Sequence, residues 1–271
     1  MDWVIEKGLA NNLNVVINMH NYDLLCSAPG EHEDRFIALW RQIVLHYREW
    51  PDSLYFEPFN EPHDKLTSER WNKMLAKTIA AMRELDKVHT IVVTGAGWGG
   101  IDWLMTLQVP EGEENYVCSF HYYQPFPFTH QGANWVGDHY SLGVEWPGPP
   151  EVKLTPHPDS LALSWLDKWY DDYNNQPERY NPAGPDAITK ELDWAIRWGE
   201  KADCALWMGE FGAYDKADMD SRVRWTAFMR QEAEKRSFTW AYWEFGAGFG
   251  VYDRTAQAWN QGLLQALIPP E

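Results

Sequence analysis

The sequence predicts a parallel α/β barrel built from strand–helix units, in one catalytic domain that spans residues 1–271. Short apolar runs bounded by polar turns alternate with longer stretches of helical periodicity, which is the pattern of βα units around a parallel sheet. A chain of 271 residues has the length of one barrel domain and can bury a substantial core. Hydrophobic residues make up 45% and charged residues 23%, which excludes a disordered or fibrous chain.

Six apolar runs have the length and the flanking turns of strands. Each is short, and each is separated from the next by enough chain to hold a crossover helix. The predicted strands are residues 14–19, 54–57, 90–94, 117–120, 205–208 and 239–243.

Amphipathic helices are predicted between these strands, because apolar residues recur there every three or four positions. Residues 68–85 place Trp71 and Leu75 on one face, with Thr67 available as the N-cap. The first twelve residues resemble the last turns of such a helix. The remaining predicted helices are residues 33–49, 186–201 and 219–235.

Residues 124–185 do not follow the strand–helix pattern. They are rich in Pro, Trp, Tyr and His, and only residues 159–173 have helical periodicity. We therefore expect a long loop excursion after the fourth strand, and long structured loops on barrels usually carry binding residues.

Composition and charge restrict the partners of the chain. A formal charge of -17 opposes binding to nucleic acid and to anionic membrane surfaces, so we expect neither partner. No apolar run is long enough to span a bilayer, and the acidic first residues are not expected to be a signal peptide. The 17 Trp and 13 Tyr exceed the needs of packing, and flat amphipathic rings suit the apolar faces of sugars, although most are expected in the core.

The three cysteines, Cys26, Cys118 and Cys204, form no spaced cluster. This spacing argues against a disulfide framework and against a zinc site, and it predicts small buried apolar residues.

Two carboxylates follow predicted strands. The strand at residues 54–57 runs into Asn60-Glu61-Pro62, and the strand at 205–208 runs into Gly209-Glu210-Phe211-Gly212, whose glycines are expected to allow a tight turn. Active sites of barrels lie at the carboxyl ends of the strands. Two carboxylates there are what glycoside hydrolysis requires, one to donate a proton and the other to attack the anomeric carbon.

His121 and Tyr123 follow the fourth strand at alternate positions, so both can point to the same side. Tyr123 could donate a hydrogen bond to the nucleophile, and His121 could bond the acid/base or a sugar hydroxyl; a purely structural pair is the alternative. His20 closes the first strand in a comparable way. Trp243 ends the last strand, either as a stacking platform for a sugar or as a core residue.

In combination, Asn60-Glu61-Pro62, His121-Tyr122-Tyr123, residues 207–212 and Trp243-Glu244 resemble family 5 glycoside hydrolases, the retaining cellulases and mannanases with (β/α)8 TIM barrels. The resemblance implies Glu61 as acid/base, Glu210 as nucleophile, a bond from Asn60 to the sugar 2-hydroxyl, and tuning of the carboxylates by His121 and Tyr123. It implies no metal, no cofactor, and a secreted or periplasmic protein. The substrate-binding residues it implies are His20, Asn21, Trp98, His130, Trp135, Trp243 and Phe249.

The sequence departs from the family at its start. It opens on the helix before the family's third strand, so an incomplete barrel of about six βα units is expected, without the first two units and without an Arg that lies near the nucleophile in the family. Such a barrel would expose the strand edges near 14–19 and 239–243. We therefore expect a homo-oligomer that covers the open side.

The expected activity is endo-acting hydrolysis of β-1,4-glucan, meaning cellulose, mixed-linkage glucan and, as a further class, mannan or glucomannan, by double displacement through a covalent glycosyl-enzyme. The alternative is a catalytically impaired remnant that only binds carbohydrate. A metal-dependent barrel hydrolase is a third interpretation, which the Asn-Glu-Pro and Gly-Glu-Phe-Gly contexts disfavour.

Overall fold

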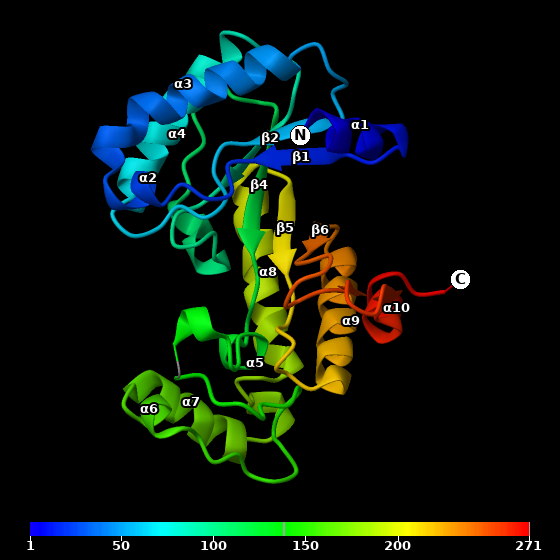
Figure 1. Ribbon diagram of the computed structural model, residues 1–271. Helices are drawn as coiled ribbons and strands as arrows, with labels where there is room; N and C mark the ends of the chain where they lie inside the picture. The colour runs from blue at the N-terminus through cyan, green and yellow to red at the C-terminus, as the bar shows by residue number, and fades with distance from the viewer. Residues whose placement is uncertain (138, 271) are drawn as a thin grey trace. The chain divides into compact units, whose positions relative to one another are not determined.

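A computed structural model describes residues 1–137 and 139–270 of the chain, which divide into two compact units (Figure 1). The first unit contains Met1–His121 and Trp198–Trp207. The second contains Tyr122–Arg197 and Met208–Glu271, as far as these are described. Helix α8 (Pro185–Ala202) and strand β5 (Leu206–Phe211) each begin in one unit and end in the other.

Four strands of the first unit pair in parallel in the order of the chain, and all four were predicted. The start of β5 adjoins the last of them, because the Cys118 N–H donates to the carbonyl of Ala205. All four residues of β3 are buried, as expected for a parallel strand that is covered on both faces. The four strands are β1 (Val15–Asn18), β2 (Leu54–Glu57), β3 (Ile91–Thr94) and β4 (Tyr116–His121).

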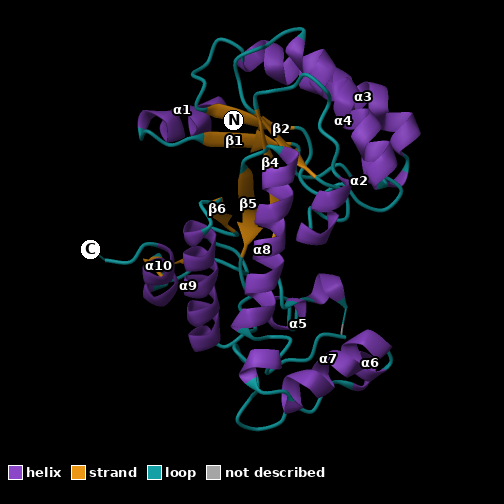
Figure 2. Ribbon diagram, turned by 180° about the vertical axis from the view of Figure 1, so that it is seen from behind, coloured by secondary structure: helices purple, strands orange, loops and turns teal. Residues whose placement is uncertain are grey.

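The helices of the first unit bury the predicted apolar faces. Helices α3 (Pro29–Tyr47) and α4 (Ser68–Arg83) lie side by side (Figures 1 and 2), and Phe36 of α3 meets Trp71 of α4 with ring centroids 6.2 Å apart. Thr67 occupies the N-cap position of α4, but its side chain makes no capping bond. The others are α1 (Asp2–Ala10), α2 (Asp23–Ser27) and the 3-10 helix η1 (Ile101–Thr106).

The second unit holds the end of β5 and strand β6 (Thr239–Tyr242), which was also predicted. Helix α9 (Met219–Lys235) is capped by Asp218, whose carboxylate accepts from the Ser221 N–H at 2.8 Å. Helix α10 (Gln261–Leu267) lies beside α9 (Figure 2). A short antiparallel pair, β7 (Tyr252–Asp253) and β8 (Ala258–Trp259), lies between β6 and α10 in the chain.

The segment at 124–185 contains short helices, and buried tyrosines hold it together. The Tyr170 hydroxyl accepts from the Ser141 N–H at 2.9 Å, and the Tyr173 hydroxyl donates to the Glu145 carbonyl at 3.0 Å. The helix predicted at 159–173 is two helices, because Leu163 has an extended backbone. The elements are α5 (Phe126–Thr129), η2 (Asn134–Val136), α6 (Pro158–Leu161), α7 (Ser164–Asn175) and η3 (Glu178–Tyr180).

The cysteines form no disulfide among the described residues. Cys26 and Cys118 are buried as predicted, whereas Cys204 is partly exposed because it lies in the turn before β5. Within 1–137 and 139–270, none of the helices combines the length and the apolar character needed to cross a bilayer.

Candidate active site

Glu61 lies four residues beyond the end of β2, and His121 is its partner. The Nδ1 atom of His121 lies 2.7 Å from Oε1 of Glu61, which is one of the partners that the sequence offered for His121. His121 is the last residue of β4 and is buried, whereas the Glu61 side chain keeps 28% of its surface exposed. Asn60 is buried beside it, and its N–H donates to the Met19 carbonyl. A carboxyl group is thus held by a buried imidazole and remains open to a ligand.

Beneath Glu61, a second carboxylate lies at the end of β2. Glu57 is 2% exposed and accepts from Nδ2 of Asn18 at 3.1 Å and from the Thr94 hydroxyl at 2.5 Å. Burial raises the pKa of Glu57, although both hydrogen bonds and the nearby His121 oppose this shift. Glu57 therefore joins the ends of β1, β2 and β3 below the candidate acid/base.

His20 lies two residues beyond β1, rather than at its end. Its Nδ1 atom is 3.5 Å from Nδ2 of Asn18, so the group that binds Glu57 also contacts His20. Burial lowers the pKa of His20, while the charge of Glu61 opposes the shift. The neighbouring Asn21 is exposed. His20 is thus favoured in the neutral form, which can both donate to and accept from a sugar hydroxyl.

Trp98 also belongs to the first unit and is 56% exposed. It lies on the glycine-rich loop after β3, where its N–H donates to the carbonyl of Pro62, the residue after Glu61. The predicted binding residue is therefore fixed to the acid/base segment.

Glu210 lies within β5 and is 9% exposed. The Tyr123 hydroxyl donates to Oε2 of Glu210 at 2.7 Å, in the hydrogen bond expected from the sequence. The prediction of a tight turn at the flanking glycines is wrong for Gly212, because its backbone is not in the left-handed region. Gly212 instead allows close approach of the chain, because a Cβ there would lie 2.1 Å from the Trp243 carbonyl oxygen.

Two further predicted binding residues of the second unit, His130 and Phe249, lie against Tyr123. The His130 ring lies edge-on to Tyr123, with centroids 5.0 Å apart, and Phe249 contacts both rings. Burial lowers the pKa of His130 to about 3, so the ring stays neutral. Trp135 is 57% exposed and packs against Phe249. Phe249 itself is buried, so it supports these rings from behind.

Trp243 follows directly after β6 and is partly exposed, and its N–H donates to the Phe211 carbonyl. Trp98, Trp135 and Trp243 thus all retain exposed surface, which a fully buried core role would exclude. Their predicted arrangement in one groove stays a prediction.

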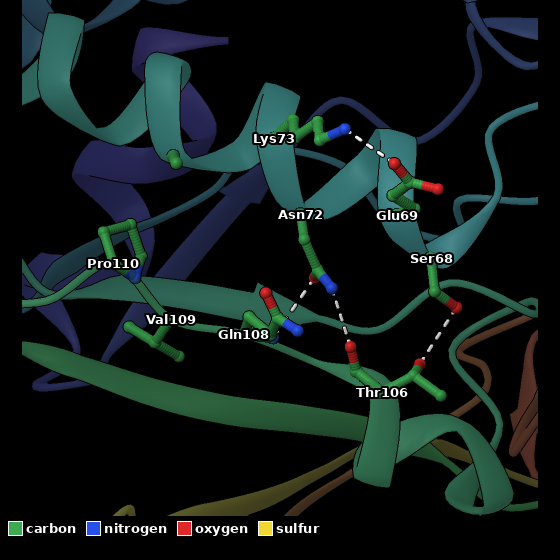
Figure 3. Close-up of a pocket in the computed structure, with 9 residues that line it drawn as sticks. Ser68, Glu69, Asn72, Lys73, Thr106, Gln108, Val109 and Pro110 are labelled. Carbon is green, nitrogen blue, oxygen red and sulfur yellow. Dashed lines mark hydrogen bonds and ion pairs between the residues drawn. The ribbon is translucent and has the colours of Figure 1, made fainter.

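One pocket of the first unit lies away from these residues. A cavity of about 560 Å³ is formed by the start of α4 and the segment around the end of η1, where Nδ2 of Asn72 donates to the Thr106 carbonyl at 2.7 Å (Figure 3). None of the predicted site residues lines it. The polar groups of this cavity, those of Asn72 and Thr106 among them, bond to one another, so the cavity identifies no ligand.

Two residues of the first unit were missed by the sequence interpretation. Glu57 could have been identified from the sequence. A carboxylate at the end of the apolar run Leu54-Tyr55-Phe56 is expected to be buried, and a buried carboxylate needs hydrogen-bond donors. His63 carried a weaker signal, since it follows Asn60-Glu61-Pro62 by a single position, but only the fold shows that its ring stacks on Trp98.

The sequence matches the family described as Cellulase (glycosyl hydrolase family 5) over residues 1–248. Among curated relatives, it is 27% identical over 262 residues to Endoglucanase 3 of Fibrobacter succinogenes and 28% identical over 281 residues to Endoglucanase C of Acetivibrio thermocellus. These alignments cover 93% and 98% of this chain, and 39% and 78% of the relatives. A third relative, Endoglucanase H of Acetivibrio thermocellus, is covered over only 25% of its length. The chain thus spans well under half of two of these relatives.

Solved structures show the same fold. Cel5A of Thermotoga maritima, in complex with cellobiose, has a TM-score of 0.84 and 42% sequence identity, covering 98% of this chain and 76% of that one. The cellulose synthase subunit Z of Clostridioides difficile has a TM-score of 0.82 and 30% identity, covering 98% and 78%. These matches confirm the predicted fold class, six strands of a partial (β/α)8 barrel. The chain belongs to the cellulase family, glycosyl hydrolase family 5.

Proposed function

We propose that this chain is an endo-acting, retaining β-1,4-glucanase in which Glu61 is the acid/base and Glu210 the nucleophile. The observation that carries the proposal is the difference between the partners of the two carboxylates: an imidazole for Glu61 and a phenol for Glu210. A histidine can pass a proton to and from its partner near neutral pH, as an acid/base needs. A tyrosine hydroxyl at 2.7 Å stabilises an ionised carboxylate, which a nucleophile must be.

The proposed reaction needs no metal or cofactor. Glu210 attacks the anomeric carbon while Glu61 protonates the departing glycosidic oxygen, which gives a covalent glycosyl-enzyme. Glu61 then takes a proton from the water that attacks the anomeric carbon, and Glu210 leaves. His121 holds the Glu61 carboxyl group in place through both steps, and Asn60 is proposed to bind the 2-hydroxyl of the reacting sugar.

Hydrolysis of carboxymethyl cellulose and mixed-linkage glucan tests this proposal. We expect a rapid loss of viscosity with few reducing ends, because an endo-acting enzyme cuts within the chain. Proton NMR of the first product should show the β-anomer, because double displacement retains configuration. An α-anomer would reject the nucleophile assignment of Glu210.

A carbohydrate-binding chain without turnover is the alternative. It would bind insoluble cellulose in a pull-down and release no reducing sugar from any glucan. The exposed surfaces of Trp98 and Trp135 fit either function, so the hydrolysis assay decides between them.

Mannan is proposed as a second substrate class. The support comes from Thermotoga maritima Cel5A, at 42% identity, which has been solved in complex with mannotriose as well as with cellobiose. Specificity constants on mannotetraose and cellotetraose would measure the preference. Activity on cellotetraose alone would restrict the proposal to glucan.

We also propose that copies of the chain associate into a homo-oligomer whose interface includes the β1 side of the first unit. Among the described strands, β1 pairs with β2 alone, and most of its residues are only half buried. Trp3, Val4 and Leu13 beside it are 58% exposed or more. Exposed apolar residues beside a free strand edge favour association. Light scattering at micromolar concentration should give a dimer or a larger oligomer, and a stable monomer would refute the proposal.

A further inference from the structure

The loop that carries Trp98 has an uncommon backbone. Gly97, Trp98 and Gly99 follow one another in the left-handed region, with φ of 69°, 56° and 65°. This region suits glycine and costs energy for a bulky residue such as Trp. The strain persists because the loop is held on both sides: Pro62 accepts from the Trp98 N–H, and the His121 N–H donates to the Gly99 carbonyl at 2.8 Å. A strained, half-exposed Trp that is held in this way is typical of a binding position.

The ring of His63 lies against the indole of Trp98. Their centroids are 5.2 Å apart and their planes differ by 9°, so the rings are stacked. Nδ1 of His63 is 2.6 Å from the Glu61 carbonyl oxygen, which can only accept, so Nδ1 carries a proton and donates. Cys26, whose pKa is raised by burial, adjoins the same nitrogen. The imidazole is therefore fixed in its tautomer and in its orientation.

These contacts connect Trp98 to one step of the proposed reaction. Trp98 is bound to the segment of Glu61 twice, by the backbone bond to Pro62 and by the ring of His63. An acid/base protonates the oxygen of the leaving group, so its segment lies beside the leaving sugar. A stacking platform attached to that segment is placed to hold the leaving sugar while the proton is transferred.

We infer that His63 is a positioning residue, which holds the Trp98 indole at the angle needed to stack on the leaving-group sugar. The inference rests on the proposed function. In this inference, the flat ring of His63 positions the Trp98 indole, and the hydrogen bond of His63 with the Glu61 carbonyl does not.

Two substitutions separate the ring from the bond. His63→Phe keeps a flat ring against Trp98 and removes the donor, whereas His63→Asn keeps a donor of similar reach and removes the ring. The substrates are cellotetraose, whose leaving group is a sugar, and 2,4-dinitrophenyl β-cellobioside, whose leaving group is neither a sugar nor in need of protonation. The ratio of their kcat/KM values reports on the leaving sugar.

In His63→Asn, this ratio should shift against cellotetraose by about 5- to 10-fold, the value of one lost aromatic contact. In His63→Phe, the ratio should stay within about 2-fold of the wild-type ratio. An equal loss in both variants would assign the effect to the hydrogen bond and overturn the inference, as would an unchanged ratio in His63→Asn. Exposed His157→Asn is the matched control, and thermal melting identifies variants that misfold.

Fluorine NMR of protein labelled with 5-fluorotryptophan tests the same inference without turnover. The Trp98 resonance is identified as the line that is absent in Trp98→Phe. We expect one narrow Trp98 line in the wild-type protein and in His63→Phe, and a broadened or divided line in His63→Asn, because the unsupported indole then samples several orientations. A narrow, unmoved line in His63→Asn would contradict the role of His63. Should the wild-type protein hydrolyse neither substrate, the proposed function fails while this measurement still decides the positioning.

Discussion

The two units of the chain surround their carboxylates with different chemistry. Around Glu61 the first unit places hydrogen-bonding groups, with His121 on the carboxyl group and Glu57 bound by Asn18 and Thr94 below it. Around Glu210 the second unit places rings, with Tyr123 in contact with His130 and Phe249. A polar network can rearrange protons, whereas a phenol that is packed among other rings holds the carboxylate it donates to in place. The contrast fits the roles that we propose for Glu61 and Glu210.

The two regions also differ in their response to pH. Burial raises the pKa of Glu57 and lowers that of His130, so each group is favoured in its neutral form. For Glu57 the stabilising contribution is complete below its unfolded pKa near 4.5 and is lost as the pH rises. For His130 it is complete above the unfolded pKa near 6.5 and is lost as the pH falls towards 3. Glu57 should therefore favour the folded state in acid, whereas His130 should favour it at neutral and basic pH.

The largest effect should follow Glu210→Ala. Loss of the proposed nucleophile should lower kcat on cellotetraose by on the order of 10⁴-fold or more, because a glycosyl-enzyme on Glu210 could not form. Azide should restore turnover of an aryl cellobioside and give the inverted glycosyl azide, which NMR can identify. A retained azide product would show that Glu210 is not the nucleophile and would remove the contrast between the units.

Glu61→Ala should lower kcat on cellotetraose by about 10²–10⁴-fold, the usual value of acid/base catalysis. With 2,4-dinitrophenyl β-cellobioside, the rate of glycosyl-enzyme formation should fall far less, since that leaving group departs without a proton. Stopped-flow release of dinitrophenolate measures this step. Equal losses on both substrates would contradict the role of Glu61 as an acid.

Trp243→Ala should lower kcat and raise KM together, because the ring is proposed to support the sugar at the reacting centre. We expect a loss of about 5- to 150-fold in kcat/KM on cellotetraose, from the 1–3 kcal/mol that a buried aromatic contact contributes. Trp165→Ala, which truncates a 53% exposed Trp of α7, is the matched control. A change in KM alone would assign Trp243 to uniform substrate binding.

His130→Phe should make the protein less sensitive to acid. Because the pKa of His130 is lowered, the free energy of unfolding of the wild-type protein should be smaller at pH 5 than at pH 7 by on the order of 2 kcal/mol. The Phe variant should not show this loss. Between pH 7 and pH 5 the melting temperature of the variant should therefore fall by about 4–8 °C less than that of the wild type. Exposed His157→Phe should show no such difference. Parallel melting curves for His130→Phe and the wild type would mean that His130 is protonated in the folded state.

An effect of opposite sign is expected from Glu57→Gln. A neutral side chain removes the cost of an ionised buried carboxylate, so the melting temperature of the variant relative to the wild type should rise between pH 5 and pH 8. Glu111→Gln, at an exposed carboxylate of the same unit, is the control. A relative fall with pH would show that Glu57 is ionised in the folded state and stabilised by Asn18 and Thr94.

The sequence by itself determined the strand–helix order and the positions of Glu61 and Glu210. Each strand is an apolar run between polar turns, and such runs can be identified locally because side chains that face a core must be apolar along their whole length. The partners His121 and Tyr123 could also be predicted, since residues two apart at a strand end point the same way. All six predicted strands are present, with β4 and β5 extending further than predicted.

Only the tertiary structure decided which side chains support the site. Glu57 and Asn18 are 39 positions apart, and His63 and Trp98 are 35 apart, so no local pattern pairs them. The sequence predicts a tight turn at Gly212. In the structure, a glycine is required there because the Trp243 carbonyl approaches closely. Periodicity reports which residues are buried, because burial acts on each residue separately. Contacts between distant segments depend on the register of neighbouring strands and on the course of their loops, which are fixed only when the chain packs.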